Sequence, residues 1–208
     1  MQIIPAILAQ TKEEFVGKVT EIFSDVDMVQ IDVMDGKFVS NSTWGTPDEI
    51  LELHLPVLFE VHLMVENPED VVGDWVRVGA HRVIFHIEAT KNPGLVIEKV
   101  RGLGREIGIA VNPETPIAAL SEWLNLIDYC LVMGVTPGAS GQKFQPKALQ
   151  KIMELKKIRP GLKVGVDGGV DFDTAREIAA AGADALNAAS AIFDYPEPVE
   201  AIEILQKI

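Results

Sequence analysis

The stretch VQIDVMDG, residues 29–36, is an apolar run with an aspartate shortly before its glycine, and KVGVDGG, residues 163–169, repeats this arrangement late in the chain. Apolar runs without alternation are typical of parallel β-strands that are covered on both faces. Such strands deliver the residues at their carboxyl ends to one shared edge, so we expect Asp32 and Asp167 to face each other across a substrate. Two carboxylates placed in this way suit the removal of a proton from one face of a carbon and its return to the other face.

Short apolar runs of this kind alternate with longer helical patterns, and no Pro/Gly/Ser-rich linker or low-complexity segment divides the chain. The predicted strands are Ile3–Leu8, Met28–Val33, Leu58–Met64, Arg82–Ile87, Glu106–Val111, Tyr129–Met133, Lys163–Val166 and Ala185–Ala188. The predicted helices are Thr11–Ile22, Pro47–Leu53, Pro68–Val78, Pro93–Leu103, Pro116–Leu124, Pro146–Ile158, Phe172–Ala181 and Pro198–Lys207. Eight β/α units in about 200 residues predict a (β/α)8 barrel, which we expect to form a single domain over residues 1–208. A doubly wound open sheet is the alternative, but no G-x-G-x-x-G fingerprint follows the first predicted strand, which makes dinucleotide binding a weak interpretation.

The charge balance of the chain disfavours two classes of partner. The formal net charge is -13 over 208 residues, so we expect no general attraction for nucleic acid or for an anionic membrane. No apolar run reaches transmembrane length, the N-terminus lacks the pattern of a signal peptide, and the single cysteine, Cys130, cannot form an internal disulfide. We therefore expect a cytoplasmic protein that captures any anionic substrate with a local device.

A histidine joins the two aspartates at the predicted strand ends. Asp32, His62 and Asp167 together could bind a divalent metal, because carboxylate and imidazole ligands suit zinc, iron, manganese or cobalt. A metal beside a carbonyl would stabilise the negative charge that develops when the neighbouring carbon loses its proton. Taken singly, a strand-end aspartate is more often a turn former, and a histidine in an apolar run is more often a hydrogen-bonded core residue. Their joint placement at three strand ends favours a site.

Further side chains fall on the same side of these strands by the two-residue period of a β-strand. They are Met34, Met64, His86 and Met133. The methionines are most economically core residues, and if they face the pocket they form a soft apolar floor for a flexible substrate. Asp35, in contrast, is followed by glycine and is typical of a turn.

Small residues gather in the loops that follow the last three predicted strands. The candidate phosphate-binding residues in these loops are Gly138, Ser140, Gly141, Gln142, Gly168, Gly169, Ala189 and Ser190. Small side chains let backbone N–H groups approach an anion, and a phosphate site after strands seven and eight is frequent in such barrels. Ordinary tight turns are the alternative interpretation of the same glycines. A phosphate site of this kind would need no lysine or arginine, which fits an acidic protein.

From Ile4 to about Ile204 the chain resembles the ribulose-phosphate 3-epimerase family. The matching motifs are DVMDGKFV at 32–39, VHLM at 61–64, FHIEAT at 85–90, GQKF at 141–144, VDGGV at 166–170 and SAIF at 190–193. The resemblance implies a (β/α)8 barrel of the ribulose-phosphate-binding type, an isomerase of the pentose phosphate pathway. It implies the interconversion of D-ribulose 5-phosphate and D-xylulose 5-phosphate, or of a similar ketose phosphate, at C3.

The resemblance also assigns roles to particular residues. In this family the aspartates that match Asp32 and Asp167 bind the metal and shuttle the proton, and the histidine that matches His62 is a metal ligand. The resemblance implies that the metal is zinc, with iron, manganese or cobalt as the alternatives. It implies a homo-oligomer, either a dimer or a hexamer.

Three single positions and one loop depart from the family pattern. Gln30 stands where the family usually has a histidine ligand, and a glutamine oxygen is a poorer ligand for zinc than an imidazole, so the metal could be absent. Ala6 replaces a serine that contacts the substrate, Ala189 replaces a glycine near the phosphate, and TPGASG, residues 136–141, replaces Asn-Pro-Gly-Phe-Gly-Gly.

Three functions therefore stay open. The first is a metal-dependent epimerase with an altered metal site, and the second is a sugar-phosphate-binding protein that has lost catalysis. The third is a lyase of the wider phosphate-binding barrel group. Such lyases typically place a lysine near the reacting carbon, and none lies at the strand ends that carry Asp32, His62 and Asp167, which disfavours the lyase.

Overall fold

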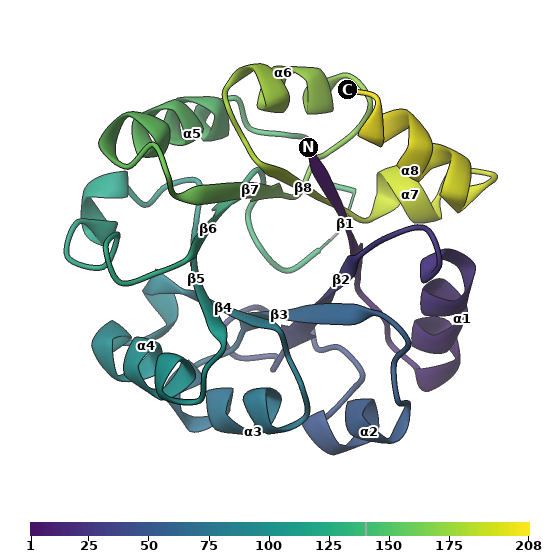
Figure 1. The fold of residues 1–208 in the computed structure, drawn as a ribbon, viewed down its shortest axis with the longest axis horizontal. Coiled ribbons are helices and arrows are strands. Elements are labelled where there is room, and N and C mark those ends of the chain that lie inside the picture. The colour runs from purple at the N-terminus through teal and green to yellow at the C-terminus, as the bar shows by residue number, and fades with distance from the viewer. Residues whose placement is uncertain (140) are drawn as a thin grey trace.

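Eight parallel strands close into a barrel in chain order in the computed structural model, which describes residues 1–139 and 141–208 (Figure 1). The strands are β1 (Gln2–Ile7), β2 (Met28–Met34), β3 (Leu58–Met64), β4 (Arg82–His86), β5 (Glu106–Val111), β6 (Tyr129–Met133), β7 (Lys163–Asp167) and β8 (Ala185–Ala188). The α-helices are α1 (Lys12–Ile22), α2 (Pro47–Glu52), α3 (Val72–Arg77), α4 (Pro93–Gly102), α5 (Lys147–Ile158), α6 (Thr174–Ala180), α7 (Ser190–Phe193) and α8 (Pro198–Gln206). Three 3-10 helices, η1 (Pro68–Asp70), η2 (Ile87–Ala89) and η3 (Ile117–Leu120), complete the described elements. The predicted (β/α)8 barrel is confirmed.

One predicted helix is wrong. The segment Pro116–Leu124 contains only the 3-10 helix η3. Most of the hydrogen bonds that follow it also span three residues, from Trp123 N to Leu120 O and from Leu126 N to Trp123 O, and one, from Leu124 N to Leu120 O, spans four. Ile117 and Leu120 are both buried, and a spacing of three residues places them on the same face of a 3-10 helix. The apolar spacing was therefore consistent with either helix type, and the tighter one formed.

Two other helical segments also differ from the prediction. The segment Pro68–Val78 begins as η1 before α3 forms, with Asn67 at a positive φ of 50° ahead of the proline. The short helix α7 follows β8 directly and was not predicted. Both differences lie at connections, where local turn geometry overrides helical periodicity.

The strands bury side chains on both faces, as their apolar runs predict. One face packs against the surrounding helices and forms the largest apolar cluster of the protein. The other face fills the barrel with a smaller cluster made of Ile4, Met28, Ile84, Ala110, Tyr129, Leu131, Met133 and Ala185. Gly165 leaves room for this filling, since a Cβ atom there would lie 1.7 Å from the Tyr129 hydroxyl. The barrel is therefore a packed core with its open end above the strand termini.

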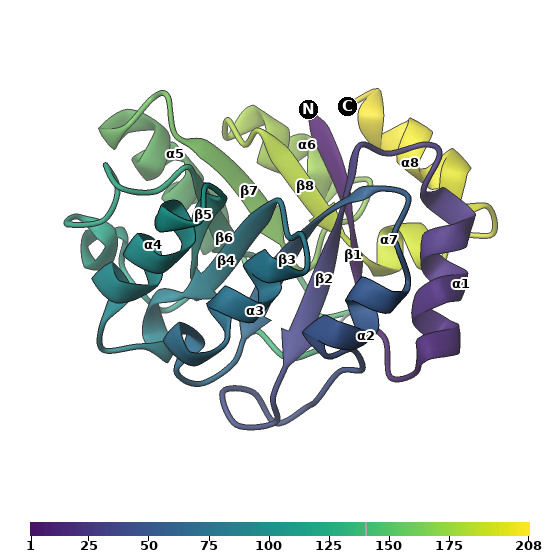
Figure 2. The same cartoon turned by 60° about the horizontal axis from the view of Figure 1, so that its bottom comes forward.

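The register between β2 and β3 arranges their inward side chains in layers. Gln30 pairs with Glu60, Asp32 with His62, and Met34 with Met64. Polar and charged side chains therefore occupy two successive layers near the carboxyl ends of the strands. Figure 2 shows that the carboxyl end of β2 and the loop that follows it lie at one end of the barrel.

None of the described helices has the length and apolar character that a membrane crossing requires.

The single cysteine provides a test of the packing. Cys130 lies on β6 with none of its surface exposed, and burial raises the pKa of its thiol to about 12. Because the thiolate is the reactive form, we expect no reaction of the folded protein with Ellman's reagent and one thiol per chain after unfolding in guanidinium. A Cys130→Ala variant is the control for background. Equal reaction rates for the folded and the unfolded protein would contradict the buried position.

Candidate active site

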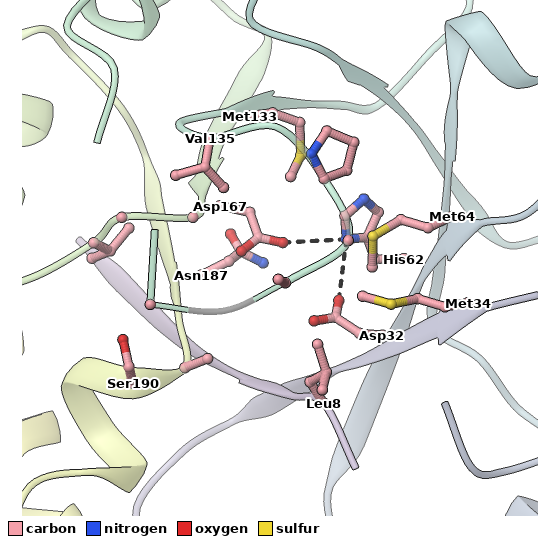
Figure 3. Close-up of a pocket in the computed structure, with 18 residues that line it drawn as sticks. Leu8, Asp32, Met34, His62, Met64, Met133, Val135, Asp167, Asn187 and Ser190 are labelled. Carbon is pink, nitrogen blue, oxygen red and sulfur yellow. Dashed lines mark hydrogen bonds and ion pairs between the residues drawn. The ribbon is translucent and has the colours of Figure 1, made fainter. Parts of the chain in front are cut away.

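A pocket of about 520 Å³, including the part open to solvent, lies at the carboxyl ends of the strands (Figure 3). Its described lining consists of Leu8, Asp32, Met34, His62, Met64, Met133, Val135, Pro137, Gly138, Ala139, Gly141, Asp167, Gly168, Gly169, Val170, Asn187, Ala189 and Ser190. The pocket brings together strand ends and loops that are far apart in the sequence.

Two carboxylates and an imidazole meet on the floor of this pocket. His62 Nδ1 lies 3.1 Å from Asp32 Oδ1 and 3.2 Å from Asp167 Oδ2 (Figure 3). The two aspartates come from β2 and β7, on different sides of the barrel, and are 7% and 8% exposed. The predicted juxtaposition of Asp32, His62 and Asp167 is therefore present.

Gln30 approaches the same two carboxylate oxygens from below. Its Nε2 atom donates to Asp32 Oδ1 at 2.9 Å and to Asp167 Oδ2 at 2.8 Å. These two oxygens are thus each contacted by the Gln30 amide nitrogen and by His62 Nδ1. Gln30 is fully buried and does not line the pocket. The predicted weak metal ligand is a hydrogen-bond donor here.

Burial and charge set the protonation of this group. Burial raises the pKa of Asp32, and the nearby Asp167 carboxylate raises it further, against the hydrogen bond from His62. Burial alone would lower the pKa of His62, but its hydrogen bonds to Asp167 and Asp32 raise that pKa to about 9. The imidazolium therefore offsets the repulsion between two buried carboxylates.

His86 lies behind His62 and outside the pocket lining. Its Nε2 atom is 2.8 Å from His62 Nε2, and burial lowers the pKa of His86 to about 4. A neutral His86 accepts a hydrogen bond from His62 Nε2, which leaves His62 Nδ1 directed at the aspartates. The Phe38 ring centre lies 4.8 Å from that of His86, and Glu88 Oε2 lies 3.4 Å from His86 Nδ1. His86 therefore orients His62 and does not line the pocket.

The donor set fits a divalent metal with three protein ligands. Asp32, His62 and Asp167 each offer one ligand atom, and these atoms lie within 4.8 Å of one another. Catalytic metal sites commonly use three such ligands and keep a position open. The hydrogen bond to His86 also favours the His62 tautomer that frees Nδ1 for a metal. We find no corresponding role for Gln30, because its nitrogen faces the site.

The upper walls of the pocket are apolar. Met34, Met64 and Met133 line it, and all three are almost fully buried. Leu8 and Val135, which were not predicted, add to this wall. The predicted apolar floor of methionines is thus a wall beside the charged group.

The loop after β2 leans over this wall. Asp35 forms the predicted turn, since its carboxylate accepts the backbone N–H groups of Lys37, Phe38 and Glu66. At the tip of the loop, Asn41 Nδ2 donates to Gly138 O at 2.7 Å. The loops after β2 and β6 therefore meet beside the pocket.

Six of the predicted small loop residues line the pocket. They are Gly138, Gly141, Gly168, Gly169, Ala189 and Ser190. Gln142 does not, because its Nε2 atom donates to Thr136 O and Ala139 O and so closes its own loop. Ser140 lies outside the residues that the structure describes.

Gly169 shows why this end of the pocket requires glycine. Its φ is +67°, and a Cβ atom there would lie 2.7 Å from the backbone nitrogen of Phe144. A side chain would therefore push the β6–α5 loop away from the end of β7. No lysine or arginine belongs to the described lining of the pocket, so backbone groups and Ser190 are the donors available to an anion.

Two departures from the family pattern have clear positions. Ala6 is buried in β1, paired in register with Gln30, and is not part of the described lining. Ala189 lines the pocket immediately before α7.

Asn187 is a site residue that the sequence analysis missed. It is fully buried on β8, lines the pocket, and donates through Nδ2 to Gln30 Oε1 at 2.7 Å. A single polar residue in the run ALNA, residues 185–188, was the available signal. The two-residue period of a β-strand places Asn187 on the inward face with Ala185.

Comparisons with known proteins identify the family of the chain. The profile described as "Ribulose-phosphate 3 epimerase family" matches residues 2–193. Ribulose-phosphate 3-epimerase of Treponema pallidum is 43% identical over 174 residues, which cover 79% of this chain and 78% of the relative. The cytoplasmic isoform of the enzyme from Oryza sativa subsp. japonica is 39% identical over 186 residues, covering 87% and 82%.

A solved structure of low sequence identity shares the fold. The 3-hexulose-6-phosphate synthase of Salmonella typhimurium superimposes with a TM-score of 0.78 at 16% identity, over 100% of this chain and 97% of that chain. At this identity the likeness concerns the barrel and not the reaction. Together with the profile match over residues 2–193 and the relatives named above, the motifs and the paired aspartates show that this chain belongs to the ribulose-phosphate 3-epimerase family.

Proposed function

We propose that the protein interconverts D-ribulose 5-phosphate and D-xylulose 5-phosphate by moving a proton at C3 between Asp32 and Asp167. One observation carries the assignment: the two carboxylates reach one pocket from β2 and β7. Each has one oxygen tied to Gln30 and His62. Membership of the family supports epimerisation as the reaction.

The environment of the carboxylates suits one acid and one base. Burial raises the pKa of Asp32, and two close carboxylates favour a state in which one is protonated. The ionised aspartate removes the C3 proton, and the electron pair of the broken C–H bond forms an enediolate across C2 and C3. The protonated aspartate then delivers its proton to the opposite face of C3. Which aspartate acts first depends on the direction of the reaction.

Asp32, His62 and Asp167 would hold the metal on which the family depends. When bound, a divalent metal supplies positive charge beside the oxygens of the enediolate. We propose zinc, with iron, manganese or cobalt as the alternatives, because the donors are two carboxylates and an imidazole. Gln30 keeps the carboxylate oxygens in place during proton transfer.

The loops after β6, β7 and β8 are the proposed phosphate site. Gly138, Gly141, Gly168 and Gly169 bring the backbone close to the pocket, and Ser190 adds a hydroxyl. A phosphate held there would leave the sugar carbons to extend toward the aspartates. A site after strands seven and eight beside a short extra helix is a recurring arrangement in these barrels.

A sugar-phosphate-binding protein without catalysis is the second candidate, supported by Gln30, Ala6 and Ala189. Metal analysis of the purified protein, combined with a coupled assay for xylulose 5-phosphate, separates the two. Metal-free protein without turnover would favour the binding protein. We also propose a cytoplasmic location, which the name of the Oryza sativa isoform supports. The homo-oligomer, a dimer or hexamer, stays a prediction that light scattering checks.

Replacing either aspartate by asparagine tests the assignment. Asp32→Asn and Asp167→Asn each remove one proton carrier and keep the side-chain volume, so we expect kcat to fall by at least roughly 100-fold with the fold retained. Circular dichroism checks the fold, and Asp173→Asn, at an exposed position, is the matched control. Substantial turnover in both site variants would refute the proton-transfer roles.

The unphosphorylated sugar tests the phosphate site. Binding energy from the remote phosphate contributes to the reaction at C3, so we expect kcat/KM for D-ribulose to be roughly 1,000-fold below that for D-ribulose 5-phosphate, or about 4 kcal/mol. Inorganic phosphate should act as a competitive inhibitor. Similar kcat/KM values for the two sugars would contradict the assignment of the late loops.

A further inference from the structure

A chain of buried polar side chains crosses the barrel interior beneath the paired aspartates. Arg82 on β4 donates to Glu60 Oε2 on β3 at 2.6 Å, and Asn187 on β8 donates to Glu60 Oε1 at 2.7 Å. Asn187 also donates to Gln30 Oε1 on β2 at 2.7 Å. Glu60, Asn187 and Gln30 are fully buried, and Arg82 is 7% exposed. A polar chain in an apolar interior needs every member paired.

Arg82, at the end of this row of side chains farthest from Gln30, is firmly anchored. The Arg82 guanidinium lies 4.0 Å from the centre of the Tyr129 ring, and its Nε atom donates to Glu106 Oε2 at 2.9 Å. Arginine donates hydrogen bonds and does not accept them. The Arg82 guanidinium forms an ion pair with Glu60 Oε2 at 2.6 Å, and this positive charge favours the Glu60 carboxylate. Glu60 is therefore the acceptor between Arg82 and Asn187.

The direction of donation passes from Glu60 to Gln30. Both Asn187 Nδ2 hydrogens are used, one on Glu60 and one on Gln30, while Asn187 Oδ1 accepts from the Tyr129 hydroxyl at 3.1 Å. Gln30 Oε1 is thus committed to Asn187. Only Gln30 Nε2 remains to face the aspartates, and it donates to both. Reversing the Gln30 amide would place its oxygen against two carboxylates and its nitrogen against a donor.

We propose that Asn187 is a positioning residue that, backed by Glu60 and Arg82, holds the Gln30 amide with its nitrogen toward Asp32 and Asp167. A metal held by Asp32, His62 and Asp167 then receives no ligand from Gln30. The Gln30 position contributes a hydrogen bond to each carboxylate instead.

This orientation selects which carboxylate oxygens carry the proton. Asp32 Oδ1 and Asp167 Oδ2 are occupied by Gln30 and His62. Among the described residues, no hydrogen bond reaches Asp32 Oδ2 or Asp167 Oδ1. These two oxygens are the ones available to the substrate carbon. This step alone rests on the proposed function, and the orientation of Gln30 can be tested without turnover.

Nuclear magnetic resonance of the wild-type protein tests the orientation directly. We expect the Gln30 side-chain amide protons to give NOEs to the β-protons of Asp32 and Asp167. A Gln30→Glu variant identifies these resonances by their loss. NOEs from the Gln30 amide protons to the β-protons of Asn187, with none to the aspartates, would overturn the proposal.

Metal titration of variants tests the role of Asn187. Residues that orient a metal site change its affinity by about 10- to 100-fold. Asn187→Leu frees the Gln30 amide to turn its oxygen to a metal, so we expect calorimetry to show roughly tenfold tighter Zn²⁺ binding. Tyr129→Phe is the matched control. It removes the hydrogen bond that Asn187 Oδ1 accepts and leaves in place both hydrogen bonds that Asn187 Nδ2 donates. It should keep the wild-type affinity.

Equal Zn²⁺ affinity in the wild type and Asn187→Leu, or the same change in both variants, would overturn the positioning role. If Asn187→Leu does not fold, the NOE pattern of the wild type still decides the orientation. A protein with the expected NOE pattern but no epimerase turnover would refute the proposed function and leave this inference intact.

Discussion

Two carboxylates held against each other in a buried pocket are the constraint on which the rest of the site depends. Two unit charges about 4 Å apart repel by about 4 kcal/mol at an effective dielectric constant of 20. Asp32 and Asp167 meet because the barrel closes β2 and β7 around one interior. Their repulsion is offset by His62 and Gln30, which both donate to the same pair of oxygens.

The residues beneath and behind Asp32 and Asp167 keep these donors directed at the two carboxylates. His62 keeps Nδ1 on the aspartates because His86 accepts from its other nitrogen. Gln30 keeps its nitrogen on them because Asn187 occupies its oxygen. The polar interior of the barrel is thus a support for two acidic side chains, and the apolar filling below it closes the barrel against water. Fold and chemistry share the same inward-facing positions.

Much of this arrangement could be predicted from residue patterns. Continuous apolar runs identified every strand, and the strand-end positions of Asp32, His62 and Asp167 identified the central group. The segment Pro116–Leu124 was predicted wrongly because Ile117 and Leu120 fit both α and 3-10 spacing. The role of Gln30 could not be predicted, since it depends on which atom of Asn187 faces it across the β8–β1–β2 closure of the barrel.

The fate of the C3 hydrogen tests the two-carboxylate account most directly. D-ribulose 5-phosphate is incubated with the protein in D₂O, and the xylulose 5-phosphate formed early is examined by proton NMR and mass spectrometry. Proton donation by a second aspartate that exchanges with solvent predicts one deuterium at C3 of the product and none at C1. A product that keeps its original hydrogen at C3 would contradict the account, because a single group would then have removed and returned the same proton.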